Sequence, residues 1–232
     1  MKKKIAISQS NYIPWKGYFD LINSVDEFVF YDCAQYTRRD WRNRNRIKAP
    51  AGMTWLSIPV RTKGAYHEPI SAIEVVDVSW STSHFQQIER CYARASSFRP
   101  VADFLWGLYG SVNSTMLSTI NRTLVTGIAG YLGVQTKLRG SSEFVLQEGR
   151  SERLLGICQS LAATTYVSGP AARTYLDVGL FSRHGIEVEW FDSSGYPEYP
   201  QLWGDFVHEV SIVDLLMNCG PDSARYFRGV EK

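Results

Sequence analysis

Residues 4–32, KIAISQSNYIPWKGYFDLINSVDEFVFYD, decide the fold. They begin with an apolar strand at residues 5–8, pass through a polar loop and continue into a short helix around Gly17. A second apolar run follows at residues 28–31. Strand, loop, helix and strand form the first unit of a nucleotide-binding α/β sheet, which holds ligands at the carboxyl ends of its strands. The segment predicts a Rossmann-like parallel sheet with a ligand loop over residues 9–18.

The length and composition predict one large domain or at most two small ones. A chain of 232 residues with 44% hydrophobic residues buries a sizeable core. We expect a single α/β domain over residues 1–232, with an inserted helical block at roughly 81–132.

The helical block is predicted from apolar residues at helical spacing. Its helices are expected at residues 81–92, 101–109 and 114–131. Outside it, strands are expected at 52–60, 70–78, 164–169 and 185–192, a strand and polar loop at 137–144, a short helix at 172–176, and longer helices at 151–163 and 210–220.

A dense basic run follows the first α/β unit. Six Lys or Arg residues fall within residues 38–48. Arginine pairs bidentately with phosphate oxygens, so the run favours a phosphate-bearing ligand. The net charge of the whole chain is only +2, which argues for a local anion site rather than a nucleic-acid coat. A solvated surface and an RNA-binding arm are the alternatives.

The loop and the basic run together give a candidate binding site. Gly17 lets a ligand approach a helix start, where N–H groups attract anions, and Trp41 or Tyr36 offers a stacking surface. A tight aromatic turn without a ligand is the alternative for the loop. The predicted substrate-binding residues are Gln9, Asn11, Tyr12, Trp15, Lys16, Gly17, Gln35, Tyr36, Arg39, Trp41, Arg42, Asn43, Arg44 and Asn45.

Two residues are candidates for a general base. His84 opens the helix expected at 81–92, and Asp32 follows a strand at the ligand end of the sheet. A structural role is the alternative for each. The four cysteines are scattered without a CxxC pair, so no metal site is predicted.

No targeting or membrane segment is predicted. Residues 2–4 are lysines, but polar residues interrupt the apolar stretch that a signal peptide needs. No run approaches 18 apolar residues. The expected location is the cytoplasm.

The loop spacing resembles the opening of HIGH-motif nucleotidyltransferases and pantothenate synthetases. In those families loop histidines hold the nucleotide phosphates, whereas Trp15 and Tyr18 stand at these positions here. This resemblance implies ATP with Mg²⁺ as an alternative ligand.

Over nearly its whole length the chain resembles the WbqC-like proteins, which occur in bacterial O-antigen and capsule gene clusters. Ser10 stands where proline is usual, and Ser83 stands where lysine commonly precedes the His84 position. The matching pieces are ISQSNYIPWKGYFDLI, DEFVFYD, QYTRRDWRNRNRIK, WLSIPV, the helix start from Trp80 to His84, TYVSG with Tyr175 and Leu176, and SIVDLLMNCG.

The resemblance implies a role in surface-polysaccharide (lipopolysaccharide O-antigen) biosynthesis. We expect a cytoplasmic transferase that puts an acyl or aminoacyl group, with glycyl as one candidate, on the amine of a dTDP- or UDP-linked amino sugar. The partners would be the nucleotide sugar and an acyl or aminoacyl donor, with tRNA as the one nucleic acid considered. The alternatives are an ATP-using ligase or nucleotidyltransferase of the HIGH-motif type and a non-catalytic nucleotide-sugar or tRNA-binding module.

Overall fold

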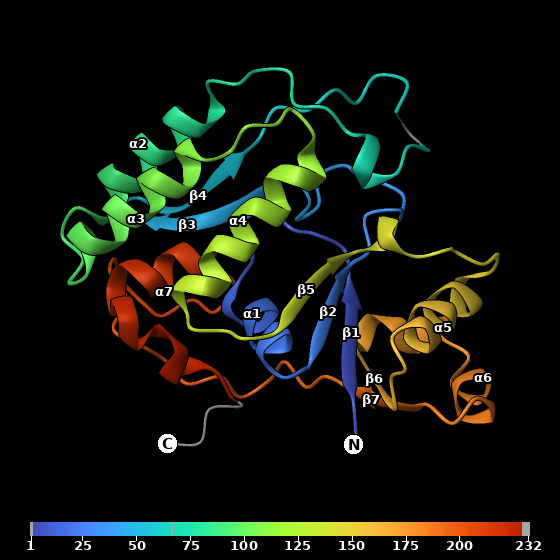
Figure 1. The fold of residues 1–232 in the computed structure, drawn as a ribbon. Helices are drawn as coiled ribbons and strands as arrows, with labels where there is room; N and C mark the ends of the chain where they lie inside the picture. Colours follow the sequence, from blue (N-terminus) through green and yellow to red (C-terminus); the bar gives the residue numbers. More distant parts are fainter. Residues whose placement is uncertain (1, 66, 229–232) are drawn as a thin grey trace.

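Five short parallel strands form the central sheet of the computed structural model, which describes residues 2–65 and 67–228 (Figure 1). The strand order is β5-β2-β1-β6-β7. Within this sheet the chain therefore runs 3-2-1-4-5, the order of a Rossmann-like doubly wound fold, and reverses between β1 and β6. The strands are β1 (Lys4–Ser8), β2 (Glu27–Phe30), β5 (Lys137–Gly140), β6 (Thr165–Ser168) and β7 (Glu187–Trp190).

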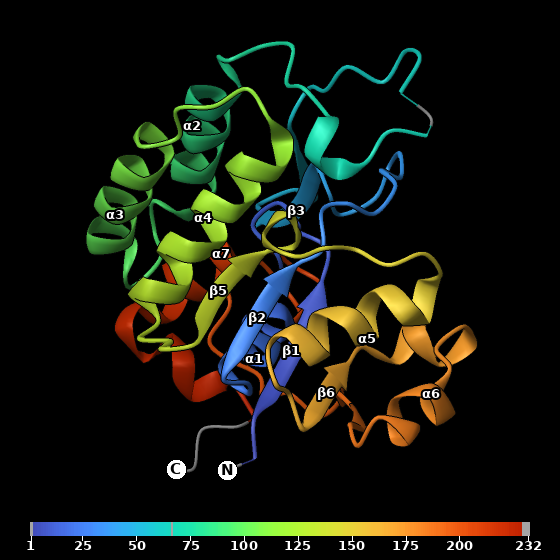
Figure 2. The same ribbon diagram turned by 45° about the vertical axis from the view of Figure 1, so that its right-hand side comes forward.

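Helices cover both faces of the sheet because alternate strand residues are apolar on both sides. Ala6 and Phe28 belong to one buried cluster, and Ile5 and Val29 belong to the other. Figure 2 shows α5 and α6 together on one side of the strands. The first cluster includes residues of α1 (Lys16–Asn23), α4 (Leu117–Tyr131) and α7 (Ile212–Cys219), and the second includes residues of α5 (Arg150–Ser160) and α6 (Val178–Arg183).

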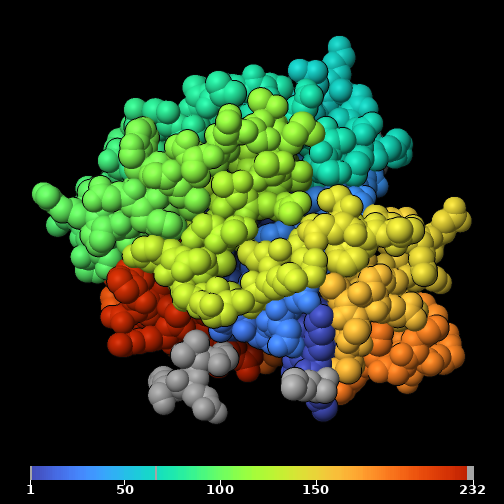
Figure 3. Space-filling model, viewed as in Figure 1, coloured from blue at the N-terminus to red at the C-terminus, as the bar shows by residue number. Residues whose placement is uncertain are grey.

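The predicted helical block is present and packs beside a β-hairpin. Its helices are α2 (Trp80–Tyr92), α3 (Phe98–Gly110) and α4. The hairpin pairs β3 (Arg44–Ala49) with β4 (Gly52–Ser57) antiparallel, apart from the main sheet. In the space-filling view of Figure 3, the blue N-terminal segments lie between the green helical block and the yellow and orange segments.

The predicted strand at residues 70–78 is wrong. The segment forms a 3-10 turn at Ile70–Ala72 and then only isolated bridges, one of them between Val75 and Val60. Ile73 and Val75 are buried, whereas Val76 and Val78 are exposed. The apolar side chains thus pack beneath a loop rather than pairing along a strand edge.

Three smaller expectations also change. The strand at 52–60 is present as β4, but only Leu56 of its six residues is buried. The short helix expected at 172–176 is a 3-10 turn at Pro170–Thr174, and β3 forms within the basic run, where the sequence predicts no strand. Residues 1, 66 and 229–232 of the predicted domain lie outside the described residues. The remaining 3-10 turns are Ser141–Glu143 and Gly220–Tyr226.

Gly17 is required because the Trp15 ring covers it. A Cβ added at Gly17 would lie 2.3 Å from Cζ2 of Trp15. We expect Gly17→Ala to lower the free energy of unfolding by about 1–3 kcal/mol through overpacking. In the control Gly130→Ala on α4, the new Cβ meets no atom within 4 Å, so helix propensity should raise stability by about 0.5–1 kcal/mol. Urea unfolding measures both, and equal effects would contradict the packing argument.

Candidate functional site

A crevice lies where the strand order reverses. Its cavity of about 740 Å³ lies at the carboxyl ends of β1, β2 and β6, and its wall includes Gln9, Tyr31 and Ser168. This volume falls within the range of small-molecule sites. The start of α5 closes another side through Gly149 and Arg150. The crevice therefore has the size and the position that doubly wound folds use for ligands.

The wall of the crevice is positively charged. Arg42, Arg150 and Arg153 line it, and no Asp or Glu lines it in the part of the chain that the structure describes. The first turn of α5, at Gly149, Arg150 and Arg153, belongs to the same wall. Guanidinium groups and a helix N-terminus both favour anions. The arrangement is suited to phosphate.

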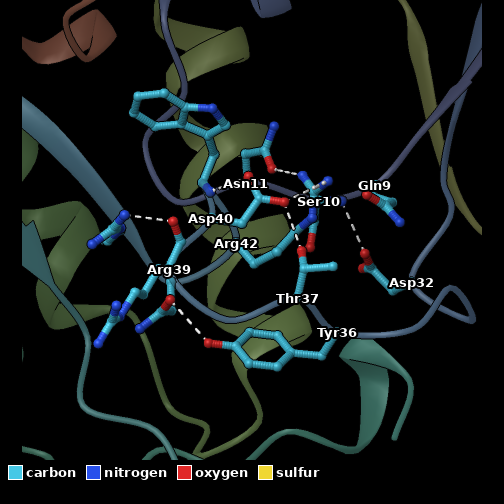
Figure 4. Close-up of polar contacts among 12 residues, drawn as sticks. Gln9, Ser10, Asn11, Asp32, Tyr36, Thr37, Arg39, Asp40 and Arg42 are labelled. Carbon is cyan, nitrogen blue, oxygen red and sulfur yellow. Dashed lines mark hydrogen bonds and ion pairs between the residues drawn. The ribbon is translucent and has the colours of Figure 1, made fainter. Parts of the chain in front are cut away.

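Arg42 is held in place by polar partners on the ligand loop and on its own turn. Its Nη1 donates to Oδ1 of Asn11, and its Nη2 lies 3.6 Å from the Asp40 carboxylate (Figure 4). Burial lowers the pKa of Arg42, and Asp40 opposes that effect. The guanidinium is thus oriented before any ligand enters.

Tyr31 offers a neutral hydrogen-bond donor inside the crevice. Burial raises its pKa to about 12, and Arg153 acts in the opposite direction. The hydroxyl keeps its proton at neutral pH and can donate to a ligand oxygen.

Asp32 lies buried at the end of β2, next to the loop that carries Gln9 and Ser10. Its Oδ1 accepts a hydrogen bond of 2.9 Å from the backbone N–H of Ser10. Its Oδ2 is buried without a hydrogen-bond partner among the described residues. Burial raises the pKa of Asp32, while hydrogen bonds from Ser10 and the charges of Arg122 and Arg42 lower it. A carboxylate with one unpaired oxygen and a raised pKa has the properties of a general base.

A second, smaller cavity adjoins the loop. Its volume is about 250 Å³. Asn11 lines this cavity, Arg42 lines the crevice, and the hydrogen bond between their side chains links the two walls. The lining residues are Asn11, Pro14, Trp15, Trp41, Asn45 and Glu209.

A partly exposed row of aromatic and guanidinium groups extends from this cavity along the hairpin. The Trp41 and Trp55 rings lie 5.7 Å apart, and both side chains are about 40% exposed (40% and 42%). Arg44 lies 4.2 Å from the Trp55 ring, and Arg46 lies within 6 Å of both rings, at 5.8 and 5.6 Å. We call Trp41, Arg44, Arg46 and Trp55 the Trp–Arg row.

The comparisons with known proteins agree with the resemblance in the sequence. The model of the WbqC-like protein family matches residues 9–226. The chain belongs to this family. An uncharacterized protein of Mycobacterium tuberculosis (strain ATCC 25618 / H37Rv), Rv1507c, is 49% identical over 226 residues, which cover 97% of this chain and 98% of that protein. No solved structure matches.

The predicted binding residues of this WbqC-like chain divide between the two cavities. Gln9, Gln35 and Arg42 line the crevice. Asn11, Trp15, Trp41 and Asn45 line the smaller cavity. Arg44 belongs to the Trp–Arg row, while Arg39 lies exposed in a turn with a positive φ of 58°. The described residues contain no helix that is long and apolar enough to cross a membrane.

The other predicted residues hold the scaffold. Tyr36 donates to Oδ1 of Asn43, which in turn donates to the carbonyl of Ile58 on the hairpin side. Lys16 is buried against Tyr196, Tyr199 and Phe206, and burial lowers its pKa to about 8. Tyr12 is fully buried, and Gly17 packs under Trp15.

His84 lies in a buried aromatic cluster and lines neither cavity. Its Nδ1 is 2.8 Å from the hydroxyl of Tyr12, which lies 2.6 Å from the hydroxyl of Tyr109. The Trp80 ring packs against it at 5.5 Å. Burial lowers the pKa of His84 to about 4, opposed by a hydrogen bond with the backbone of Ser57. The histidine is therefore neutral and enclosed, and its catalytic role stays a prediction.

The arginines on α5 are binding candidates that the sequence pattern does not reveal. The pattern predicts the helix but no ligand role for its first turn. A usable signal was present: Gly149, Arg150 and Arg153 open the helix that leads into β6. In a doubly wound sheet a helix that leads into a central strand begins at the ligand edge.

The burial of His84 predicts a stability change with pH. The pKa is about 4 in the folded protein and about 6.5 when unfolded, so the unfolded chain binds more protons between these values. Stability should therefore fall as pH drops from about 6.5 to 4, by up to about 3 kcal/mol. Urea unfolding across this window should show a flatter pH dependence for His84→Gln, whereas the exposed control His184→Gln should keep the original slope. An unchanged slope in His84→Gln would contradict the enclosed, neutral state.

Proposed function

We propose that the crevice binds the phosphates of a nucleotide-linked amino sugar and that the protein transfers an acyl or aminoacyl group to the sugar amine. One observation carries this proposal: the cavity at the strand reversal is lined by three arginines and no acid in the described chain. The protein would act in the cytoplasm as a single α/β domain, in the surface-polysaccharide setting that the family resemblance implies.

The arginines suit a diphosphate better than a single carboxylate. Arg150 and Arg153 are three residues apart and therefore share one side of α5. Arg42 reaches the cavity from the turn before β3. Three cationic groups from two elements can neutralise the two phosphates of a dTDP- or UDP-sugar, and the hydroxyl of Tyr31 adds a neutral donor.

The transfer needs a base near the amine. The amine nitrogen forms a bond to the carbonyl carbon of the donor, and the bond from that carbon to the leaving oxygen or sulfur breaks. The sugar ammonium first loses one proton, the amine loses a second after attack, and the leaving group takes up one. Asp32 does not itself line the crevice, but its chain neighbours Tyr31 and Cys33 do. We assign it to this proton transfer because its Oδ2 is unpaired and burial raises its pKa. His84 is enclosed by aromatic rings and is less suited to the role.

The ligase of the HIGH-motif type is less well supported. In such an enzyme the phosphates would approach the loop at Gly17, but the Trp15 ring occupies that space. Lys16, which could have supplied a charge there, donates instead to the carbonyl of Pro197. ATP with Mg²⁺ is therefore the alternative ligand. If substitution of Asp32 leaves turnover unchanged, the alternative function is a non-catalytic binding module.

The phosphate role of α5 is tested by binding. We expect dTDP-, UDP- or GDP-sugars to raise the melting temperature, because a ligand at about 100 times its Kd stabilises by roughly 2.7 kcal/mol. Arg150→Gln and Arg153→Gln should each weaken the binding, measured by calorimetry, about tenfold or more. Arg99→Gln on the exposed start of α3 is the matched control and should change nothing. Sugar-nucleotide binding that survives the double α5 variant would sink the proposed site.

The base assignment is tested separately with Asp32→Asn. The amide keeps an oxygen for the Ser10 N–H but cannot take a proton, so turnover should fall by about 10²–10⁴-fold. Calorimetry should show unchanged affinity for the sugar nucleotide. Asp103→Asn on the exposed face of α3 controls for loss of a carboxylate. Full turnover in Asp32→Asn would remove the residue from the reaction.

A further inference from the structure

We propose that the smaller cavity and the Trp–Arg row form a separate subsite for the adenosine phosphate portion of the activated donor. That this ligand is the donor of the transfer rests on the proposed function. The binding of an adenosine phosphate is argued from the cavity and the Trp–Arg row alone. The shared chemistry is an adenine base next to phosphate, which occurs both in coenzyme A and at the 3′ end of an aminoacyl-tRNA.

The cavity has the size and lining of a base pocket. At about 250 Å³ it holds one ring system but not a whole nucleotide sugar, and the indoles of Trp15 and Trp41 form part of its wall. Base stacking on an aromatic side chain tolerates any planar ring. Glu209 is the one acidic residue in the described lining of this cavity. A carboxylate accepts a hydrogen bond from an exocyclic amine, so the pocket favours adenine over a base that lacks this group.

The Trp–Arg row supplies charge where a phosphate would leave the pocket. Arg46 lies 5.8 Å from the ring of Trp41, which lines the cavity, and Arg44 lies beside Trp55 further along the hairpin. Nη2 of Arg44 donates to the carbonyl of Arg39, Nη2 of Arg46 donates to the carbonyl of Glu209, and neither Nη1 has a hydrogen-bond partner among the described residues. These Nη1 groups retain donors for phosphate oxygens.

Without a ligand, the Trp–Arg row exposes large apolar ring surfaces to water, which is unfavourable. Trp41 and Trp55 each leave about two-fifths of a large ring in water (40% and 42% exposed). The loop beside them contains Ile13 at a φ of 35°, a conformation that is strained for a β-branched residue. Strained backbone and exposed aromatic side chains at one cavity are typical of a binding site rather than of a stable surface.

The position of the cavity fits a second substrate. Asn11 and Arg42 join its wall to that of the crevice through one hydrogen bond. A donor in the smaller cavity and a sugar nucleotide in the crevice would therefore approach each other at this pair. Two nucleotide subsites explain why the predicted binding residues divide into two groups.

Calorimetry with coenzyme A, a CCA trinucleotide, AMP and IMP tests the subsite on the intact protein. We expect Trp41→Ala to weaken the adenosine ligands about 5- to 150-fold, the range measured for one stacked base. Arg46→Gln should also weaken them, and AMP should bind more tightly than IMP. Trp106→Ala, which removes an exposed tryptophan on α3, is the matched control and should bind as the unmodified protein does. If Trp41→Ala does not fold, Trp41→Phe and Trp41→Leu replace it, and only the phenylalanine should retain binding.

The outcomes separate the two sources and the two proposals. Binding of coenzyme A alone indicates a thioester donor, binding of CCA alone indicates a tRNA end, and either result supports the subsite. Binding that is indifferent to Trp41 but lost in the Arg150→Gln, Arg153→Gln double variant would place these ligands in the crevice and overturn the inference. No binding by any of the adenosine probes would also overturn it. Loss of UDP-sugar binding in the same double variant, by contrast, bears only on the proposed function.

Discussion

The side-chain amide of Asn45 is the interaction on which the site depends. Its Nδ2 donates to the backbone carbonyls of Tyr12 and Ile13, at 3.1 and 2.9 Å, and so fastens the ligand loop to the hairpin. The hydroxyl of Ser211 adds a third bond to the Ile13 carbonyl. These carbonyls are buried, and leaving them unpaired would cost roughly 1–3 kcal/mol each. The loop is thereby held in a conformation that Ile13 would not adopt alone.

The hydrogen bonds of Asn45 hold the loop of residues 9–18 between the two cavities. Strand β3 alternates, so Asn45 and Ile47 turn inward while Arg44 and Arg46 lie on the other face with the tryptophans. The same strand that secures the loop therefore presents the charged row. The backbone N–H of Tyr12 donates to the carbonyl of Trp41, which ties the loop to the turn that carries Arg42. The same few residues therefore pack the loop and line the two cavities.

The sequence predicted the sheet well because apolar periodicity reports burial directly. The first unit, the helical block and the later strands lie close to their expected positions. The strand predicted at 70–78 is absent because an apolar pattern indicates burial but does not indicate whether a neighbouring strand is available for pairing. The loop and the basic run lie at the two cavities, but residue type alone does not separate Arg42, which lines the crevice, from Asn43, which holds the scaffold. Arg150 and Arg153 were missed because their contribution depends on strand order, which only the folded chain reveals.

The position of the arginines around the crevice is related to the structure of the turn that begins α1. Doubly wound folds commonly hold phosphate at the first helix, where a glycine lets the backbone approach the anion. Here Trp15 covers Gly17, and Lys16 donates to Pro197. The start of α1 is therefore closed by side chains. The next helix that opens at the strand reversal is α5, and its first turn carries Arg150 and Arg153 in the wall of the crevice. An aromatic first turn and a cationic later helix are thus two parts of one arrangement, in which the proposed anion site lies at α5, across the reversal from α1.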